Sequence, residues 1–156
     1  MKTLILYATK HGGTHDVAKR IAKKIHGAVI HDLKQANIPP LAEYDCVIFG
    51  SSIYVGQVRK EAKAFLVQNA NKLKEKKLGL FLCGLQESEE KQCFASNFPP
   101  DILESAKATS FLGGIFDPDK AGFMERFIIK AVAKMKGYTD KIDNDKIERF
   151  AEEMMK

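Results

Sequence analysis

Three short segments of this chain are almost entirely apolar, and they constrain the fold more than any other feature. The segments are 2–8 (KTLILYA), 45–50 (DCVIFG) and 78–83 (LGLFLC). A strand with one solvent-facing side alternates apolar and polar residues, whereas a strand covered on both faces does not. These segments therefore predict strands inside a sheet that has helices on each side.

Helical spacing of apolar residues separates these strands. Thr14 is predicted to cap a helix that repeats apolar residues every four positions and ends at Gly27. Further helices are predicted at 60–73, 123–135 and 143–155, and weaker strands at 28–33 and 109–116. The polar segment 85–106 is expected to be a long connection with one or two helical turns.

Alternation of strands and helices indicates how the strands are joined. Parallel neighbours need crossover connections, and these are right-handed. Five strands in 156 residues suit one α/β domain over residues 1–156, with three layers, a doubly wound parallel sheet and the strand order 2-1-3-4-5. Such sheets bind ligands outside the carboxyl ends of the strands, where the order switches between strands 1 and 3.

The turn after the first strand has the composition of an anion-binding loop. Two glycines in Thr9–Thr14 (TKHGGT) allow a tight turn, and successive backbone N–H groups can point into its concavity. The positive end of the helix dipole favours a phosphate there. The spacing is neither that of a GxxxxGK[ST] loop nor that of GxGxxG. A plain turn before a helix would explain the segment equally well in isolation.

The stretch Leu4–Thr14 (LILYATKHGGT), with Ala18 following, resembles the flavodoxin family signature, an apolar strand followed by T-x-x-G-x-T and a helix. This resemblance implies a flavodoxin-like fold and FMN as cofactor. It also implies that the loop holds the FMN phosphate, mainly through backbone N–H groups. The residues concerned are Thr9, Lys10, His11, Gly12, Gly13 and Thr14.

Two other stretches are similar to the quinone-linked, FMN-dependent protoporphyrinogen dehydrogenases and their flavodoxin-domain relatives. They are 44–56 (YDCVIFGSSIYVG), followed by Phe65, and 111–114 (FLGG), followed by 125–130 (ERFIIK). The similarity implies an oxidoreductase that passes electrons between a small organic substrate, such as protoporphyrinogen, and an acceptor such as a quinone. No catalytic residue is assigned.

An isoalloxazine ring needs an aromatic or apolar surface and nearby backbone groups, since the protein tunes the cofactor. Tyr54 lies in the turn where the ring would stack, and Gly56 could rotate its peptide toward the ring at low cost. The turn after strand 4 would form the far wall. The cofactor-binding residues predicted in these two turns are Ser51, Ser52, Ile53, Tyr54, Val55 and Gly56, and Gly84, Leu85 and Gln86.

Two other functions remain open: a non-enzymatic flavodoxin-type electron carrier and a flavin-free interaction domain. The formal net charge of +5 distinguishes this chain from the carrier flavodoxins, which as a family are strongly acidic. It favours an anionic substrate or redox partner protein and does not by itself indicate nucleic acid, which is not expected as a partner. The helix predicted at 123–135 is basic on one side, so it either packs on the sheet or touches an anionic membrane surface.

Cysteine and histidine placement argues against metal or disulfide chemistry. Cys46, Cys83 and Cys93 form no CxxC motif, which suits free thiols in a reducing compartment. His11 and His15 do not share a helical face, so no metal site is expected. No apolar run is long enough to span a bilayer, and we expect a cytoplasmic protein, with peripheral contact at the inner membrane face as the alternative.

Overall fold

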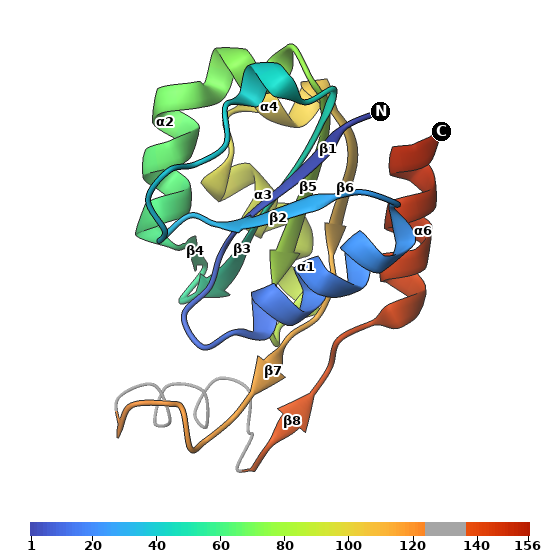
Figure 1. Cartoon of the computed structure of the whole chain (residues 1–156). Coiled ribbons are helices and arrows are strands. Elements are labelled where there is room, and N and C mark those ends of the chain that lie inside the picture. The colour runs from blue at the N-terminus through green and yellow to red at the C-terminus, as the bar shows by residue number, and fades with distance from the viewer. Residues whose placement is uncertain (124–136) are drawn as a thin grey trace.

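The computed structural model describes residues 1–123 and 137–156, in which a central sheet lies between two layers of helices (Figure 1). The elements in chain order are β1 (Thr3–Ala8), α1 (Gly13–Lys24), β2 (Val29–Asp32), β3 (Cys46–Tyr54), β4 (Gln57–Val58), α2 (Lys60–Lys74), β5 (Lys77–Cys83), α3 (Glu90–Asn97), α4 (Pro100–Ser105), β6 (Ala106–Phe111), β7 (Ile115–Phe116), β8 (Thr139–Asp140) and α6 (Asn144–Met155). Short 3-10 turns occupy Leu41–Glu43 and Glu87–Glu89.

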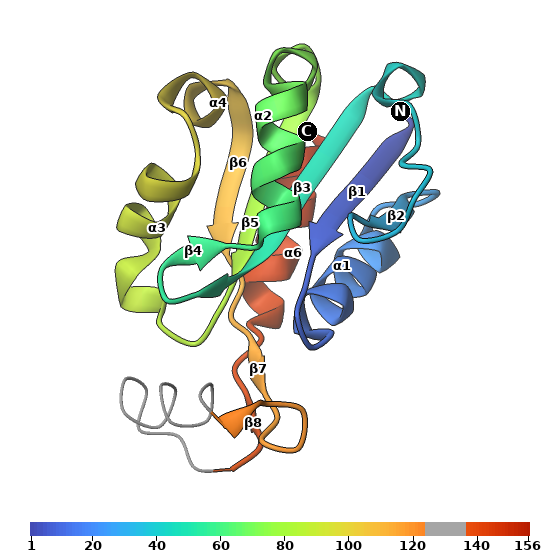
Figure 2. The ribbon, with the colours of Figure 1, turned by 90° about the vertical axis from the view of Figure 1, so that its left-hand side faces the viewer.

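The main sheet has the strand order β2-β1-β3-β5-β6, and these five strands are parallel. The two-residue β4 is an antiparallel addition to the end of β3. Without β4 the order becomes 2-1-3-4-5, so the predicted flavodoxin-like α/β topology is confirmed. Figure 2 shows these strands side by side. The chain adds β2 on one side of β1 and then β3, β5 and β6 on the other, so the topological switch point lies between β1 and β3.

Two apolar cores, one on each face of the sheet, explain why the central strands are apolar throughout. In β1, Leu4 and Leu6 belong to the core shared with α2, α3 and α4, while Ile5 and Tyr7 belong to the core shared with α1 and α6. All four side chains are buried. Successive side chains of a strand point to opposite faces, so a strand between two helical layers has no polar side.

Three predicted boundaries differ from the structure. α1 begins at Gly13, and its N-cap is Gly12 rather than Thr14, which lies inside the first turn. β3 continues through Tyr54, because residues 53 and 54 pair with β4, so the predicted turn at 51–57 is mostly strand. The segment 85–106 holds two α-helices, α3 and α4, rather than a long connection.

The last strand of the sheet is shorter than predicted. β6 starts at Ala106 and stops at Phe111, and Gly113, with φ +78°, turns the chain away from the sheet. Beyond this turn β7 pairs antiparallel with β8 and forms an arm that extends past the carboxyl edge of the sheet (Figure 2). The helix predicted at 123–135 lies, from residue 124 onward, outside the described residues.

The predicted closing helix is present as α6, which packs against α1 and β6. No helix in the described part of the chain combines the length and the apolar composition that a membrane span requires.

Candidate functional site

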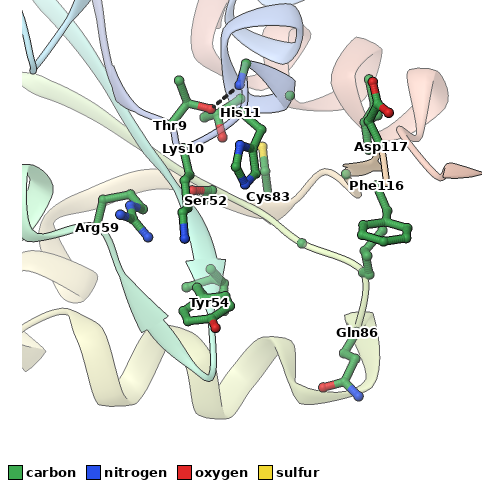
Figure 3. Close-up of a pocket in the computed structure, with 18 of the residues that line it drawn as sticks. Thr9, Lys10, His11, Ser52, Tyr54, Arg59, Cys83, Gln86, Phe116 and Asp117 are labelled. Atoms are coloured by element: carbon green, nitrogen blue, oxygen red, sulfur yellow. Dashed lines mark hydrogen bonds between the residues drawn. The ribbon is translucent and has the colours of Figure 1, made fainter. Parts of the chain in front are cut away.

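The conformation of the loop between β1 and α1 is stabilised by a hydrogen bond within the loop. Gly12 adopts φ +94°, and its N–H donates to Thr9 Oγ1 at 3.0 Å (Figure 3). No side chain caps α1 at its N-terminus. The first N–H groups of a helix lack partners within the helix, so the loop leaves amide donors for an anion at this end.

Unpartnered polar atoms gather around the same loop. Thr14 is 1% exposed, and within residues 1–123 and 137–156 no donor or acceptor forms a hydrogen bond of normal length and angle with its Oγ1. Ser52 Oγ, Arg59 Nε and His15 Nδ1 are buried atoms of the same kind, and all four residues line one cavity. Buried polar atoms without partners are rare and costly. Their concentration here fits a site that a polar ligand completes.

The hairpin from β3 to β4 forms a second wall. Ile53 pairs with Val58 and Tyr54 with Gln57, so Val55 and Gly56 are the two turn residues, with φ of +50° and +70°. Positive φ at both positions is the mark of a type I′ hairpin. The turn thereby places Tyr54 at the carboxyl edge of the sheet.

Lys10 connects the loop with this hairpin. Its Nζ lies 5.0 Å from the centre of the Tyr54 ring, a cation–π distance. Figure 3 shows the Lys10 side chain reaching from the loop toward Tyr54, with Arg59 beside it. A positive charge from the neighbouring loop therefore lies against the Tyr54 ring.

A third wall follows β5. The N–H of Gly84 donates to Gly113 O at 3.1 Å, and a Cβ at Gly114 would stand 3.0 Å from Gly84 O. This close approach ties the turn after β5 to the start of the β7–β8 arm. In Figure 3, Phe116 and Gln86 both lie across from Tyr54, with Phe116 above Gln86 in this view.

These walls enclose a cavity of about 640 Å³ at the carboxyl ends of β1, β3 and β5. It brings together every residue that the sequence predicted for cofactor binding except Ser51, which is fully buried behind it. The Ser51 hydroxyl accepts from Arg59 N at 3.0 Å and donates to Ser52 O at 2.9 Å. Ser51 therefore supports the wall from behind.

Sequence reasoning missed the residues that reach the cavity from distant elements. Arg59 comes from the start of α2, and Glu89 and Cys93 come from the region of α3. The β7–β8 arm and the residues next to it add Ile115, Phe116, Asp117, Lys120 and Tyr138. The pair Gly113-Gly114 at the end of β6 was the one sequence signal that the chain turns toward the cavity there.

The electrostatics of the loop side are cationic. Desolvation lowers the pKa of His11 below its ordinary value, and four neighbouring cations lower it further: Lys10, Arg59, Lys120 and Lys34. Positive charge that disfavours protonation of His11 favours an anion beside it.

The three cysteines are free and buried. Cys83, which lines the cavity, has its pKa raised by burial to about 12, against a smaller opposing effect of the Thr14 hydroxyl. Cys83 is therefore a neutral thiol rather than a nucleophile. Among the described residues no cluster of His, Cys, Asp and Glu could hold a metal ion.

Comparison of the sequence with known families identifies the family of this chain. Residues 4–143 match the family described as flavodoxin domain. The chain is 23% identical over 147 residues to protoporphyrinogen IX dehydrogenase [quinone] of Escherichia coli K12, covering 88% of this chain and 81% of that protein.

Solved structures share the fold. Oxidised flavodoxin 2 from Bacillus cereus aligns with a TM-score of 0.63 and 20% identity over 99% of this chain and 98% of that one. A flavoprotein from Lactobacillus acidophilus, solved in complex with FMN, aligns with a TM-score of 0.53 and 18% identity over 72% of this chain and 90% of that one. The chain described here belongs to the flavodoxin domain family.

Proposed function

We propose that this protein binds FMN in the cavity and acts as an oxidoreductase that passes electrons between a small organic substrate and an acceptor such as a quinone. One observation carries the proposal: the loop Thr9–Thr14 and the hairpin with Tyr54 wall the same cavity of about 640 Å³. A phosphate site and an aromatic stacking surface within one cavity match the two ends of FMN.

The residues present fit the cofactor. Thr14 offers a buried hydroxyl without a complete hydrogen bond in the described chain, and the uncapped start of α1 offers N–H donors. Tyr54, Gly56 and the turn Gly84–Gln86 would hold the ring. The bound flavin would supply the redox chemistry, while this chain's residues bind it, orient it and shield it from water.

The substrate proposal rests on similarity and charge. The Escherichia coli relative is named protoporphyrinogen IX dehydrogenase [quinone], and the match covers most of both chains. The net charge of +5 and the cations around His11 favour a substrate or partner that carries carboxylates or other anionic groups. We therefore propose protoporphyrinogen as the first substrate to test.

The test has two stages. The purified protein is titrated with FMN at micromolar levels, and we expect flavin fluorescence to be quenched by stacking on Tyr54. Riboflavin, which lacks the phosphate, should bind more weakly. A protein that leaves the fluorescence of FMN unchanged would refute the proposal.

The second stage measures anaerobic turnover of protoporphyrinogen with a menaquinone analogue as acceptor. Turnover that depends on added FMN supports the enzyme. Quenching without turnover would instead support the alternative function, an electron carrier that docks on redox proteins.

A further inference from the structure

Asn97, the last residue of α3, has a buried side chain that forms hydrogen bonds with the backbone of the hairpin between β3 and β4. It is 8% exposed. Its Oδ1 accepts from Val58 N at 2.9 Å, and its Nδ2 donates to Gly56 O at 2.9 Å and to Cys93 O at 2.8 Å. Both amide hydrogens and the carbonyl oxygen are therefore used, two of the three bonds on the hairpin and one on its own helix.

The backbone of the hairpin is strained, so bonds from outside the hairpin help to keep its conformation. Val55 has φ +50°, and a left-handed conformation costs a residue other than glycine about 1–2 kcal/mol. Its side chain is 67% exposed, so packing offsets little of this strain. The bonds from Asn97 reach Gly56 O, in the turn, and Val58 N, in β4, so they hold the strand side of the turn and oppose its relaxation.

Asn97 itself does not line the cavity, whereas Tyr54, Val55 and Gly56 do. Its effect on a ligand must therefore pass through its bonded partners, which are the hairpin, through two bonds, and Cys93, through one. We propose that Asn97 is a positioning residue: it fixes the Tyr54–Gly56 wall in its ring-accepting conformation before the ligand arrives. This inference rests on the proposed function, because the ligand in question is the flavin ring.

The physical reason is preorganisation. A ligand that must first order a mobile wall binds with an affinity reduced by the fraction of protein in the competent conformation. The phosphate loop Thr9–Thr14 belongs to a different connection, between β1 and α1. The Lys10 side chain contacts the Tyr54 ring, but the loop backbone is held by its own bond from Gly12 N to Thr9 Oγ1. Loss of Asn97 should therefore weaken ring binding while phosphate binding stays the same.

Two variants separate the bonds. Asn97→Ser keeps a hydroxyl that can bond to Cys93 O within the helix and loses both hairpin bonds. Asn97→Asp keeps the shape and the acceptor for Val58 N but has no donor for Gly56 O or for Cys93 O. The matched control is Asn69→Ala in α2, since Asn69 Nδ2 also donates to a backbone oxygen of its own helix, Phe65 O at 3.0 Å, but does not touch the hairpin.

The experiment measures FMN dissociation constants by fluorescence quenching, and the affinity for inorganic phosphate by its competition with FMN. We expect Asn97→Ser and Asn97→Asp each to raise the FMN dissociation constant roughly tenfold. The phosphate inhibition constant should stay within about twofold of wild type in both, as should both constants in Asn69→Ala.

Hydrogen exchange of the ligand-free variants provides a second readout, because the amides of the hairpin should exchange faster while those of β1 do not. An FMN constant that stays at the wild-type value in Asn97→Ser would overturn the inference. So would a parallel loss of FMN and phosphate binding, which would indicate a merely structural role. Wild-type protein that does not bind FMN would instead defeat the proposed function, and this inference with it.

Discussion

The ring of Phe81 in β5 lies directly over the backbone of Gly50, its register partner in β3. A Cβ at position 50 would overlap that ring, and Phe81 is fully buried. The two residues form a unit in which the absence of one side chain makes room for the other. The centre of the sheet depends on this pairing.

Gly50→Ala should therefore destabilise the protein by roughly 1–3 kcal/mol, because the Phe81 ring cannot move without displacing other core residues. The free energy of unfolding in urea measures this. Gly79→Ala is the comparison: its Cβ would stand 2.7 Å from Met154 Sδ and 3.0 Å from Phe150 Cζ, and the flexible Met154 side chain, the nearer of the two, can adjust. A Gly79→Ala loss larger than the Gly50→Ala loss would contradict this account.

Val55→Asn should stabilise the protein by about 1 kcal/mol. Val55 holds φ +50° while mostly exposed, and asparagine adopts the left-handed region more readily than a β-branched residue. Val67→Asn serves as control, because Val67 is 84% exposed on α2 and has no positive φ to relieve. Thermal unfolding of both variants gives the answer, and equal melting temperatures for Val55→Asn and wild type would show that the turn stores no strain.

The fold was predictable where the sequence pattern reflects a two-sided environment. β1, β3 and β5 are covered on both faces, so their apolar runs identified them. β6 lies at the sheet edge, where Lys107 and Thr109 face solvent, and its mixed composition hid its start. In α3 the apolar residues Cys93, Phe94 and Ala95 are consecutive in the middle of the helix, so no helical repeat indicated it.

The candidate site could be predicted in part, like the fold. The carboxyl ends of parallel strands meet at one edge, so the turns after β1, β3 and β5 could be assigned to one site from order alone. Arg59, Phe116 and Tyr138 could not be assigned, because tertiary contacts bring them there. The β7–β8 pairing involves two residues on each strand, too few for a periodic pattern.

The stability of the folded chain should fall at alkaline pH, and Cys83 should contribute to the fall. The thiol's ordinary pKa is 9.0, and burial raises the pKa of folded Cys83 to about 12. Between these values the unfolded chain loses the proton while the folded chain keeps it, so the free energy of unfolding decreases by up to about 1.4 kcal/mol per pH unit. Below pH 9.0 this contribution is complete.

Urea unfolding under reducing conditions, at about pH 8 and about pH 10, measures the effect. Burial also raises the pKa of Tyr7, to about 12, and the pKa of Cys46, so both groups lower stability at alkaline pH in the same direction. Comparison of Cys83→Ala with wild type therefore isolates the contribution of Cys83. We expect a smaller loss of stability for Cys83→Ala than for wild type. Equal losses would show that the folded thiol ionises.

Lys10→Gln should raise the pKa of His11. Desolvation, the largest cause of its lowered pKa, remains in the variant, so the new value should stay below 6.5. Lys34→Gln should act in the same direction with a smaller effect, since Lys34 is the weakest of the four cations that act on His11. NMR titration of the His11 ring measures both, and an unchanged or lower pKa in Lys10→Gln would show that Lys10 does not contribute to the field at the loop.

Thr14→Val should separate ligand binding from stability. The Thr14 hydroxyl is buried without a complete hydrogen bond in the described chain, so its replacement by a methyl group should leave the free energy of unfolding of the ligand-free protein equal or higher. If the hydroxyl serves a bound phosphate, FMN affinity should fall by about 1–2 kcal/mol.

The matched control for this change is Thr3→Val at the start of β1. Thr3 is also 1% exposed, its Oγ1 is also buried without a complete bond in the described residues, and it does not line the cavity. Thr3→Val should therefore leave the FMN dissociation constant unchanged. The two threonines differ mainly in position, with Thr3 at the start of β1 and Thr14 in the first turn of α1. Weaker FMN binding in both variants would therefore mean that the fold rather than the hydroxyl is responsible. Unchanged binding in Thr14→Val would remove Thr14 from the phosphate site.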